Sequence, residues 1–391
     1  MPRLPFPVES RLPGVGTTIF TVMSRLAGEC GALNLSQGFP DFSAPPELFD
    51  LVSRHMHAGS NQYAPMAGVP ALREAICARS EGLYGTRYDP EHEVTVTAGG
   101  TQAIFTAITA LVRPGDEVIV LEPVYDSYVP AVELAGGRVL RASLTPPGYR
   151  PDWEAIRGLL SPRTRMILVN SPHNPTGSVF TRSDLDALAG LVRGTGIVIL
   201  SDEVYEHIVF DGARHESVSR HPELAPRSFV VGSFGKTFHV TGWKVGWALA
   251  PRELMAEFRK VHQFVVFTVN TPVQLALADF MSDARRWLEL PAFYQRKRDL
   301  FRAGLAATPF EPLPCAGTYF QLASTARVSD EPDTILAERL TREFGVASIP
   351  VSAFLANGRQ DRVLRFCFAK SDETLERACE RLARVPAGVF T

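Results

Sequence analysis

Seven short apolar runs, set apart by loops and helical segments, dominate the middle of this 391-residue chain. They lie at residues 94–97, 118–121, 139–142, 166–169, 197–200, 229–231 and 245–249. Most of them are continuous rather than alternating, which is typical of strands that are buried on both faces of a sheet. Helical segments lie between several of the runs, for example at 101–111, 153–160 and 184–192. This alternation predicts an α/β domain with a mainly parallel sheet.

The pattern changes beyond about residue 285. A long helical stretch at 283–307 precedes three runs with strand character, at 317–322, 346–349 and 363–368, and helical segments at 334–344 and 374–383. This mixture predicts a second, smaller α+β domain. We therefore expect an N-terminal arm (1–46) that joins the small domain, a large domain (47–285) and a C-terminal small domain (286–391).

The composition is that of an ordinary globular protein, with 45% hydrophobic and 21% charged residues. The net charge is −2 and the lysines and arginines are spread along the chain, which predicts no nucleic-acid partner. The five cysteines include no CxxC pair, which indicates reduced thiols in a cytoplasmic protein and no zinc site. The most apolar long segment, 264–280, is interrupted by Asn270, Pro272 and Asp279, and predicts a buried helix region rather than a membrane span.

The segment SFGKTFHVTGWK, which begins at Ser233 and ends at Lys244, carries the densest chemistry. Lys236 lies just past the strand predicted at 229–231, beside small and hydroxyl residues, and Lys244 follows. A lysine in this setting suits an amine nucleophile next to an anion site. The alternative is a surface loop with two solvated lysines. A P-loop is excluded by spacing, because the position that must be glycine is Val230.

Ligands of open α/β sheets bind outside the carboxyl ends of the strands, so the polar residues found there are candidates. Gly100 and Thr101 follow the first run and begin a helix, whose free N–H groups suit a phosphate, although glycine-rich turns before helices are common. Tyr125 follows the second run, where it either stacks on a flat ring or belongs to the core.

Further candidates follow later strands. Asn174 lies in NSPHNPTG, which is either a binding loop or only a turn. Asp202 and Tyr205 lie in SDEVYEH, where a buried acid needs a cation or a donor, unless it caps a helix. Arg365 lies in the strand LRFCFA, where it either binds a carboxylate or faces outward. We interpret His173 as structural, because it has no partner at metal-ligand spacing.

Taken together, these residues suit a ligand with a phosphate, a flat ring, a ring nitrogen that needs an acid, and a carbon that accepts an amine. Pyridoxal 5′-phosphate has these features, and Arg365 is left for a substrate carboxylate. The ordered segments LSQGFPDF, NQY, NSPHNPTG, SDEVYEH, SFGKTFHVTGWKVGW and LRFCFAK span nearly the whole chain. In them the chain resembles the class I/II, fold type I pyridoxal-phosphate aminotransferases, and within these the kynurenine, glutamine and methionine branch.

The resemblance implies a large α/β/α domain that binds the cofactor, a small α+β domain, and a role for each matching residue. Lys236 would form the internal aldimine, Asp202 would pair with the ring nitrogen, and Tyr205 with Asn174 would bond the ring 3′ oxygen. The residues implied to stack on the ring or hold the phosphate are Tyr125, Gly100, Thr101, Ser233, Lys244 and, from a second subunit, Tyr63. A homodimer with shared active sites follows from this role of Tyr63.

The resemblance also implies the activity, the transfer of an amino group between an L-amino acid and a 2-oxo acid. Arg365, Asn174 and the Gly38 backbone would hold the substrate carboxylate, and Phe20 would line the side-chain pocket. The substrate stays open between methionine, glutamine, leucine, aromatic and kynurenine-like amino acids. Two alternatives share the scaffold: a cysteine-conjugate C–S β-lyase and an N-succinyldiaminopimelate aminotransferase. A third is a cofactor-binding protein without catalysis.

Overall fold

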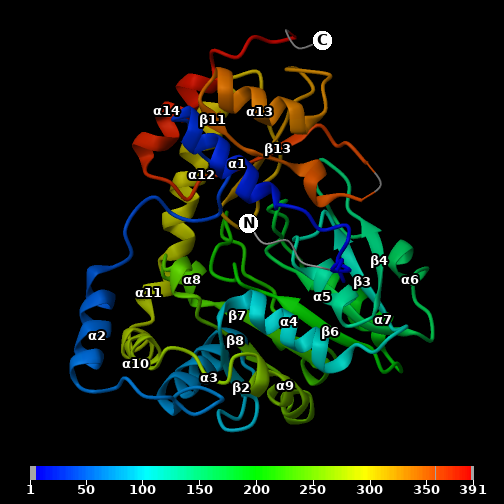
Figure 1. The fold of residues 1–391 in the computed structure, drawn as a ribbon, viewed down its shortest axis with the longest axis vertical. Helices are drawn as coiled ribbons and strands as arrows, with labels where there is room; N and C mark the ends of the chain where they lie inside the picture. Colours follow the sequence, from blue (N-terminus) through cyan, green and yellow to red (C-terminus); the bar gives the residue numbers. More distant parts are fainter. Residues whose placement is uncertain (1–5, 357, 389–391) are drawn as a thin grey trace.

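The computed structural model describes residues 6–356 and 358–388. Figure 1 shows two parts, with a large twisted sheet and its helices in the lower part and a smaller group of strands and helices above it. The long helix α12 (Leu290–Ala306) runs between the two parts.

A seven-stranded sheet forms the large part, in the order β2-β8-β7-β6-β5-β3-β4. Its strands are β2 (Val94–Thr97), β3 (Glu117–Glu122), β4 (Arg138–Ser143), β5 (Thr164–Asn170), β6 (Val198–Asp202), β7 (Ser228–Ser233) and β8 (Gly246–Leu249). Within this sheet β8 pairs antiparallel with β2 and β7, and the other pairs are parallel. Each of the seven apolar runs therefore forms a strand here, and the predicted mainly parallel α/β fold is confirmed.

Helices cover both faces of this sheet, which explains why its strands are apolar without alternation. Val118 and Val120 pack into one buried cluster with helices α4, α5 and α9, whereas Ile119 and Leu121 pack into a second cluster with α3 and α7. The helices of the large part are α2 (Pro46–His57), α3 (Pro70–Tyr84), α4 (Gly99–Leu111), α5 (Tyr128–Leu134), α6 (Trp153–Arg157), α7 (Arg182–Val192), α8 (Phe234–Thr237), α9 (Arg252–Val265) and α10 (Thr271–Phe280).

The small part contains a four-stranded antiparallel sheet in the order β12-β13-β10-β9. Its elements are α11 (Arg285–Leu288), α12, β9 (Glu311–Pro312), β10 (Phe320–Ser324), α13 (Asp333–Glu343), β11 (Val346–Ala347), β12 (Ile349–Pro350), β13 (Val363–Cys367) and α14 (Asp372–Leu382). The run expected at 346–349 is divided, because β11 leaves this sheet and pairs with the N-terminal segment instead. The helix expected at 283–307 is divided as well, since α12 begins anew at Leu290 with a proline in its first turn.

The N-terminal segment packs on the small part. Strand β1 (Leu33–Asn34) pairs parallel with β11, and helix α1 (Ile19–Cys30) lies against α13. These contacts support the division that we propose for the chain, with an arm at 1–46, a large domain at 47–285 and a small domain at 286–391.

The segment 264–280 differs from our expectation of one buried helix region. Helix α9 ends at Val265, and α10 begins at Thr271, where Pro272 in its first turn favours a new helix start. Only α10 is largely buried, whereas the side chain of Phe264 is 83% exposed and that of Phe267 is 42% exposed. Over the described ranges, no helix is long and apolar enough to cross a membrane.

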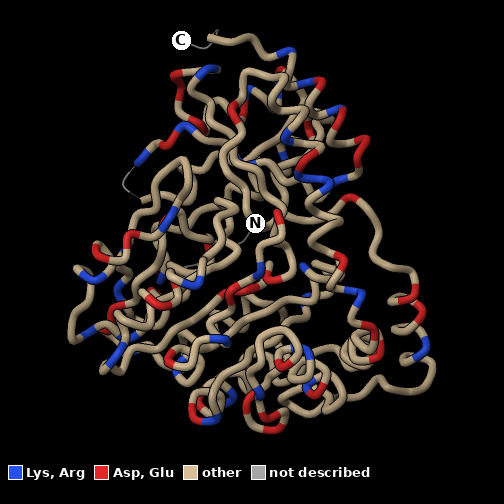
Figure 2. Tube along the Cα trace, turned by 180° about the vertical axis from the view of Figure 1, so that it is seen from behind, with Lys and Arg blue, Asp and Glu red and all other residues tan. Residues whose placement is uncertain are grey.

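Charged residues of both signs are interspersed over the molecule, as Figure 2 shows along the chain trace. Many of them are paired at the surface, for example Arg193 with Glu223 and Arg296 with Asp372. The small net charge of the sequence is therefore also locally balanced in the fold.

Gly232→Ala should destabilise the protein by about 1–3 kcal/mol or more, because a Cβ at this position of β7 would lie 2.0 Å from the Trp247 ring. Gly190→Ala in α7 is the matched control, since a Cβ there meets no atom within 4 Å and alanine favours the helix by up to about 1 kcal/mol. Urea unfolding of both variants measures the two effects, and equal free energies of unfolding would contradict the predicted clash.

Candidate active site

The carboxyl ends of β2, β3, β5, β6 and β7 meet at one edge of the large sheet, and a cavity of about 220 Å³ opens there. The sequence predicts ligands at this edge. Every predicted site residue except Tyr63 lines this cavity: Phe20, Gly38, Gly100, Thr101, Tyr125, Asn174, Asp202, Tyr205, Ser233, Lys236, Lys244 and Arg365. The structure therefore brings together side chains that are up to 345 positions apart, from Phe20 to Arg365.

Asp202 is the last residue of β6 and is almost fully buried. Its carboxylate accepts hydrogen bonds from the Tyr128 hydroxyl at 2.5 Å and from the Val204 N–H at 3.2 Å. Burial raises the pKa of Asp202 to about 6, and the hydrogen bond from Tyr128 opposes that shift. An acid in this position is well suited to a cationic ring nitrogen, which would relieve the cost of its buried charge.

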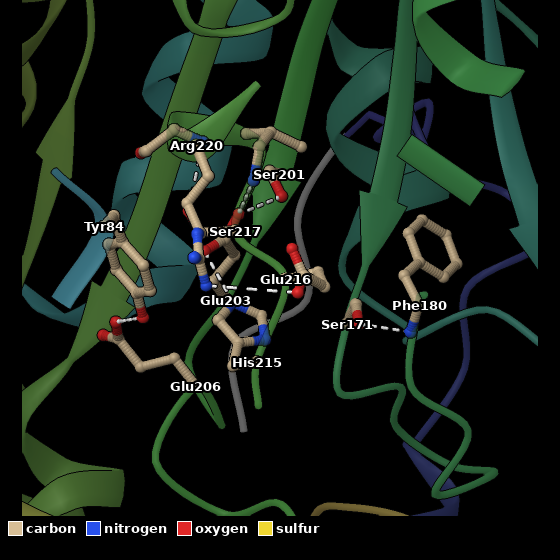
Figure 3. A network of polar contacts seen from close by, with 12 residues as sticks. Tyr84, Ser171, Phe180, Ser201, Glu203, Glu206, His215, Glu216, Ser217 and Arg220 are labelled. Atoms are coloured by element: carbon tan, nitrogen blue, oxygen red, sulfur yellow. Dashed lines mark hydrogen bonds and ion pairs between the residues drawn. The ribbon is translucent and has the colours of Figure 1, made fainter. Parts of the chain in front are cut away.

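The Asn170 amide and the Glu203 carboxylate hold the backbone around Asp202 in place. The Asn170 amide donates to the Asp202 carbonyl at 2.8 Å and accepts from the Asn174 N–H at 2.8 Å, so it ties the loops after β5 and β6 together. The next residue in the chain after Asp202, Glu203, lies beside Ser201 and His215, as Figure 3 shows. The Glu203 carboxylate accepts from the Ser201 hydroxyl and lies 2.8 Å from His215 Nε2. This buried network holds the segment that carries Asp202 and Tyr205.

Glu206, four residues after Asp202, anchors the same segment to helix α3. The Glu206 carboxylate accepts a hydrogen bond from the Tyr84 hydroxyl, as Figure 3 shows, and forms an ion pair of 2.8 Å with Arg79. The Arg79 guanidinium also stacks at 4.6 Å on the Trp247 ring. Buried charges need such partners, and here they join α3 to the loop after β6.

Lys236 lies in the short helix α8, directly after β7, and its amine points into the cavity. The amine donates hydrogen bonds to the Tyr319 hydroxyl at 2.9 Å and to the Gly38 carbonyl at 3.2 Å. Burial, with a smaller contribution from the Arg365 guanidinium, lowers its pKa to about 8, while nearby acidic groups oppose the shift. The amine is therefore available as a nucleophile near neutral pH.

The start of α4 provides a place for a phosphate. Gly99 has φ +78°, a left-handed conformation that favours glycine, and no side chain caps the helix after it. A Cβ built on Gly99 would lie 3.5 Å from Lys244 Nζ, so the absence of a side chain keeps space open beside this cation. The free N–H groups at Gly100 and Thr101 together with Lys244 suit a phosphate. Pyridoxal phosphate thus fits the residues of the cavity at its phosphate, ring nitrogen and carbonyl positions.

Arg365 lies in β13 and is 1% exposed, so it does not face outward as one reading of the sequence allowed. Its guanidinium donates to the Asn174 side-chain oxygen and to the Ser36 carbonyl, both at 2.8 Å. The guanidinium lies 3.9 Å from the Phe320 ring centroid, and the rings of Phe20 and Phe354 lie at 5.2 and 5.6 Å. A planar cation held in this way suits a substrate carboxylate.

Tyr63, predicted as a site residue, and His173, predicted to be structural, both lie outside the cavity lining. Tyr63 is 85% exposed and its ring stacks edge-on against Phe267 at 5.5 Å. His173 is buried, its Nδ1 lies 2.7 Å from the Thr176 hydroxyl, and burial lowers its pKa to about 4, which supports a structural role. In the described part of the chain, no group of three or more His, Cys, Asp or Glu residues could hold a metal ion.

Two neighbours of these residues were missed from the sequence, namely Tyr128 and Tyr319. Tyr128 lies three positions after Tyr125 in YDSY, so its position close to a predicted site residue was the available signal. Asn170, by contrast, begins NSPHNPTG, where its amide was a candidate beside that of Asn174. Tyr319 has no such signal, because it reaches Lys236 from the small part of the molecule, 83 residues further along the chain.

Comparison with known proteins identifies the family of this chain. A family model of aminotransferase class I and II matches residues 31–382. The methionine aminotransferase of Escherichia coli K12 is 50% identical over 386 residues, covering 98% of this chain and 100% of that protein. A crystal structure of an Escherichia coli protein with a methionine aminotransferase function has a TM-score of 0.95 at 51% identity, covering 97% of this chain and 100% of that chain.

The N-succinyldiaminopimelate aminotransferase of Mycobacterium tuberculosis has a TM-score of 0.94 at 40% identity, covering 97% of this chain and 100% of that chain. The chain therefore belongs to the class I and II aminotransferases. It is a pyridoxal-phosphate-dependent transaminase of fold type I, as the sequence resemblance implied.

Asp202→Asn should stabilise the cofactor-free protein above about pH 6. The folded-state pKa of Asp202 is about 6 and its ordinary value is 3.8, so ionisation of this carboxyl opposes folding at higher pH. The cost is absent below about pH 4, grows up to about pH 6 and then stays constant at roughly 3 kcal/mol or less. Urea unfolding of both proteins at about pH 4.5 and pH 7.5 measures it.

Asp283→Asn is a control in which the change in stability should have the opposite sign. Hydrogen bonds from Arg285 lower the pKa of Asp283 to about 2, so its ionisation favours folding. That variant should lose stability at neutral pH and lose none at strongly acidic pH. A stabilisation by Asp202→Asn that does not change with pH would contradict the ionisation argument.

Proposed function

We propose that this transaminase takes its amino group from an L-amino acid with a long apolar side chain, methionine above all, and gives it to a 2-oxo acid. The observation that carries the proposal is the surrounding of Arg365, whose guanidinium is enclosed by the rings of Phe20, Phe320 and Phe354. The methionine aminotransferase relative supports it, because its identity of 50% extends over its whole length.

The cofactor roles are part of this proposal. When bound, pyridoxal phosphate supplies the electron sink that makes the Cα proton of an amino acid removable. Lys236 would hold the cofactor through its amine and carry the Cα proton, and Asp202 would keep the ring nitrogen protonated. Tyr205 and Asn174 bond the ring hydroxyl oxygen. The residues that hold the ring face and the phosphate are Tyr125, Gly100, Thr101, Ser233 and Lys244, all on the cavity wall.

Substrate orientation follows from Arg365, Asn174 and the Gly38 backbone, which we propose hold the α-carboxylate. The Arg365 guanidinium already has Asn174 on one side, and its Nε has no hydrogen-bond partner within the described residues. A buried donor without a partner costs free energy, which a bound carboxylate would recover.

The cations on the cavity wall argue against a second acidic group on the substrate. The wall carries three of them, Lys236, Lys244 and Arg365, and each already has a role with the cofactor or the α-carboxylate. A distal carboxylate, as in aspartate or N-succinyldiaminopimelate, would lie near aromatic rings without a partner, which is costly. An uncharged, apolar side chain such as that of methionine meets no such penalty.

A panel of amino donors, each paired with several 2-oxo acids, tests this proposal. Methionine and leucine should give kcat/KM values at least about 100-fold above those of aspartate, glutamate and N-succinyldiaminopimelate, a difference of about 2.7 kcal/mol in transition-state binding. Preference for a dicarboxylic donor would overturn the proposal. A cysteine conjugate that yields pyruvate and ammonia without amino-group exchange would favour the C–S lyase alternative.

The Arg365→Lys variant is the control for the panel. Lysine cannot reproduce the planar contacts of Arg365 with Asn174, Ser36 and Phe320, so KM should rise for all donors alike, by about 10-fold or more. A change that is confined to one donor would place the α-carboxylate elsewhere.

We also propose a cytoplasmic homodimer with shared active sites, in which Tyr63 contacts the phosphate bound to the partner subunit. The thiols support the location, because each cysteine of the chain is free. The dimer is supported by exposed apolar side chains that we call the α9 patch: Phe264, Val265 and Phe267 at and just after the end of α9, and Tyr63, whose ring contacts that of Phe267. Each of them is at least 42% exposed. Exposed aromatic side chains of this kind are enriched at subunit interfaces.

Phe264→Asp should convert the dimer into a monomer, because it places a charge in the α9 patch and burying an unpaired charge is costly. Size-exclusion chromatography with light scattering measures the mass. Ile335→Asp on α13 is the matched control, since that side chain is 47% exposed but lies outside the patch, and its variant should stay dimeric. An unchanged mass for Phe264→Asp would contradict the proposed interface.

A further inference from the structure

Tyr319 is a fully buried residue at the boundary between the two parts of the molecule, just before β10. Its hydroxyl donates a hydrogen bond to the Gly38 carbonyl at 2.5 Å and accepts one from the Lys236 amine at 2.9 Å. The same amine donates to the Gly38 carbonyl at 3.2 Å. Tyr319, Lys236 and Gly38 thus form a closed triangle of hydrogen bonds.

The backbone that carries Tyr319 is fixed to the large part. The Thr318 N–H donates to the Ile208 carbonyl at 2.9 Å, and the Phe210 N–H donates to the Ala316 carbonyl at 3.0 Å. The Tyr319 ring also packs edge-on against Tyr205 at 5.1 Å. The hydroxyl is therefore held in place by the loop that follows Asp202, and not by Lys236 alone.

The triangle determines how a neutral Lys236 amine is oriented. A neutral amine has two N–H bonds and one lone pair, and Tyr319 and Gly38 supply one acceptor for each N–H bond. Because the Tyr319 proton is donated to Gly38, the oxygen of Tyr319 presents a lone pair to the lysine. Burial raises the pKa of Tyr319 well above its ordinary value, so its hydroxyl keeps that proton. The remaining lone pair of the amine is left free to accept a proton.

We propose that Tyr319 is a positioning residue of this enzyme, which with the Gly38 carbonyl holds both N–H bonds of the free Lys236 amine and aims its lone pair at the substrate Cα proton. This inference rests on the proposed role of Lys236 as the proton carrier. In the step, the lone pair of Lys236 forms a new N–H bond, the Cα–H bond breaks, and its electron pair stays with the substrate and its cofactor. The resulting ammonium keeps its two hydrogen bonds, and the third N–H carries the proton onward.

Tyr294 provides a matched control inside the same aromatic cluster. It is fully buried, and its ring centroid lies 5.8 Å from that of Tyr319. Its hydroxyl, however, has no hydrogen-bond partner in the described parts of the chain. The variants Tyr319→Phe and Tyr294→Phe each remove one buried hydroxyl from this aromatic cluster, and only Tyr319→Phe removes a contact with Lys236.

The experiment measures single-turnover half-reactions of the holoenzymes with methionine and with Cα-deuterated methionine. Tyr319→Phe should slow the half-reaction about 10- to 100-fold, a part of the ~10²–10⁴ that acid–base catalysis typically contributes. The deuterium isotope effect should increase, while KM and the cofactor affinity from spectral titration stay within about twofold of wild type. Tyr294→Phe should match the wild type in all of these measurements.

A second readout does not depend on turnover. Competitive labelling of the Lys236 amine in the cofactor-free protein, followed across pH, measures its pKa. Tyr319→Phe should lower that pKa, because the hydroxyl oxygen accepts more strongly from the ammonium than from the neutral amine.

Unchanged half-reaction rates and an unchanged Lys236 pKa in Tyr319→Phe would overturn the inference about Tyr319 alone. Equal slowing by Tyr294→Phe would also overturn it, because the effect would then come from packing. Lys236→Ala tests the role of Lys236 separately from that of Tyr319, since turnover that persists in this variant would overturn the proposed role of Lys236 itself.

Discussion

The amine of Lys236 can act as a nucleophile only while it is neutral, and its position in a buried cavity beside the Arg365 guanidinium favours the neutral form. Burial lowers the lysine pKa to about 8, and the neighbouring cation contributes in the same direction. Two buried cations in one cavity are costly unless acceptors surround them. The carbonyls of Gly38 and Ser36, the Asn174 side-chain oxygen and the Tyr319 hydroxyl are those acceptors, and the Asp202 carboxylate adds a negative charge nearby.

The groups of the site come from two sheets that have no strand in common, and from a segment between them. The large sheet presents Asp202, Asn174 and Lys236 at its carboxyl edge, because parallel strands end on the same side. The small sheet presents Arg365 from β13 and Tyr319 from the start of β10. The segment 35–38 lies between them, and its carbonyls accept from both Lys236 and Arg365. The site is complete only where the two parts meet, which explains why the cavity lies there.

The sequence was informative where one residue type has few uses. A lysine after a buried strand, an acid at a strand end and an arginine among aromatic residues each limit the chemistry, and all three line the cavity. The strand runs were also predictable, since burial on both faces requires continuous apolar residues. The exposure of Phe264 was not, because an apolar side chain has the same signature whether it packs inside the chain or forms a surface patch.

By itself, the sequence determined the alternation of strands and helices, the mainly parallel sheet and the set of groups that suit pyridoxal phosphate. These follow from local patterns of burial and from the chemistry of single side chains. The tertiary structure alone decided that Arg365 faces inward, that Tyr128 bonds Asp202, and that Tyr319 meets Lys236. Such contacts depend on how helices and sheets that are far apart in the sequence pack together, and no local sequence pattern encodes that packing.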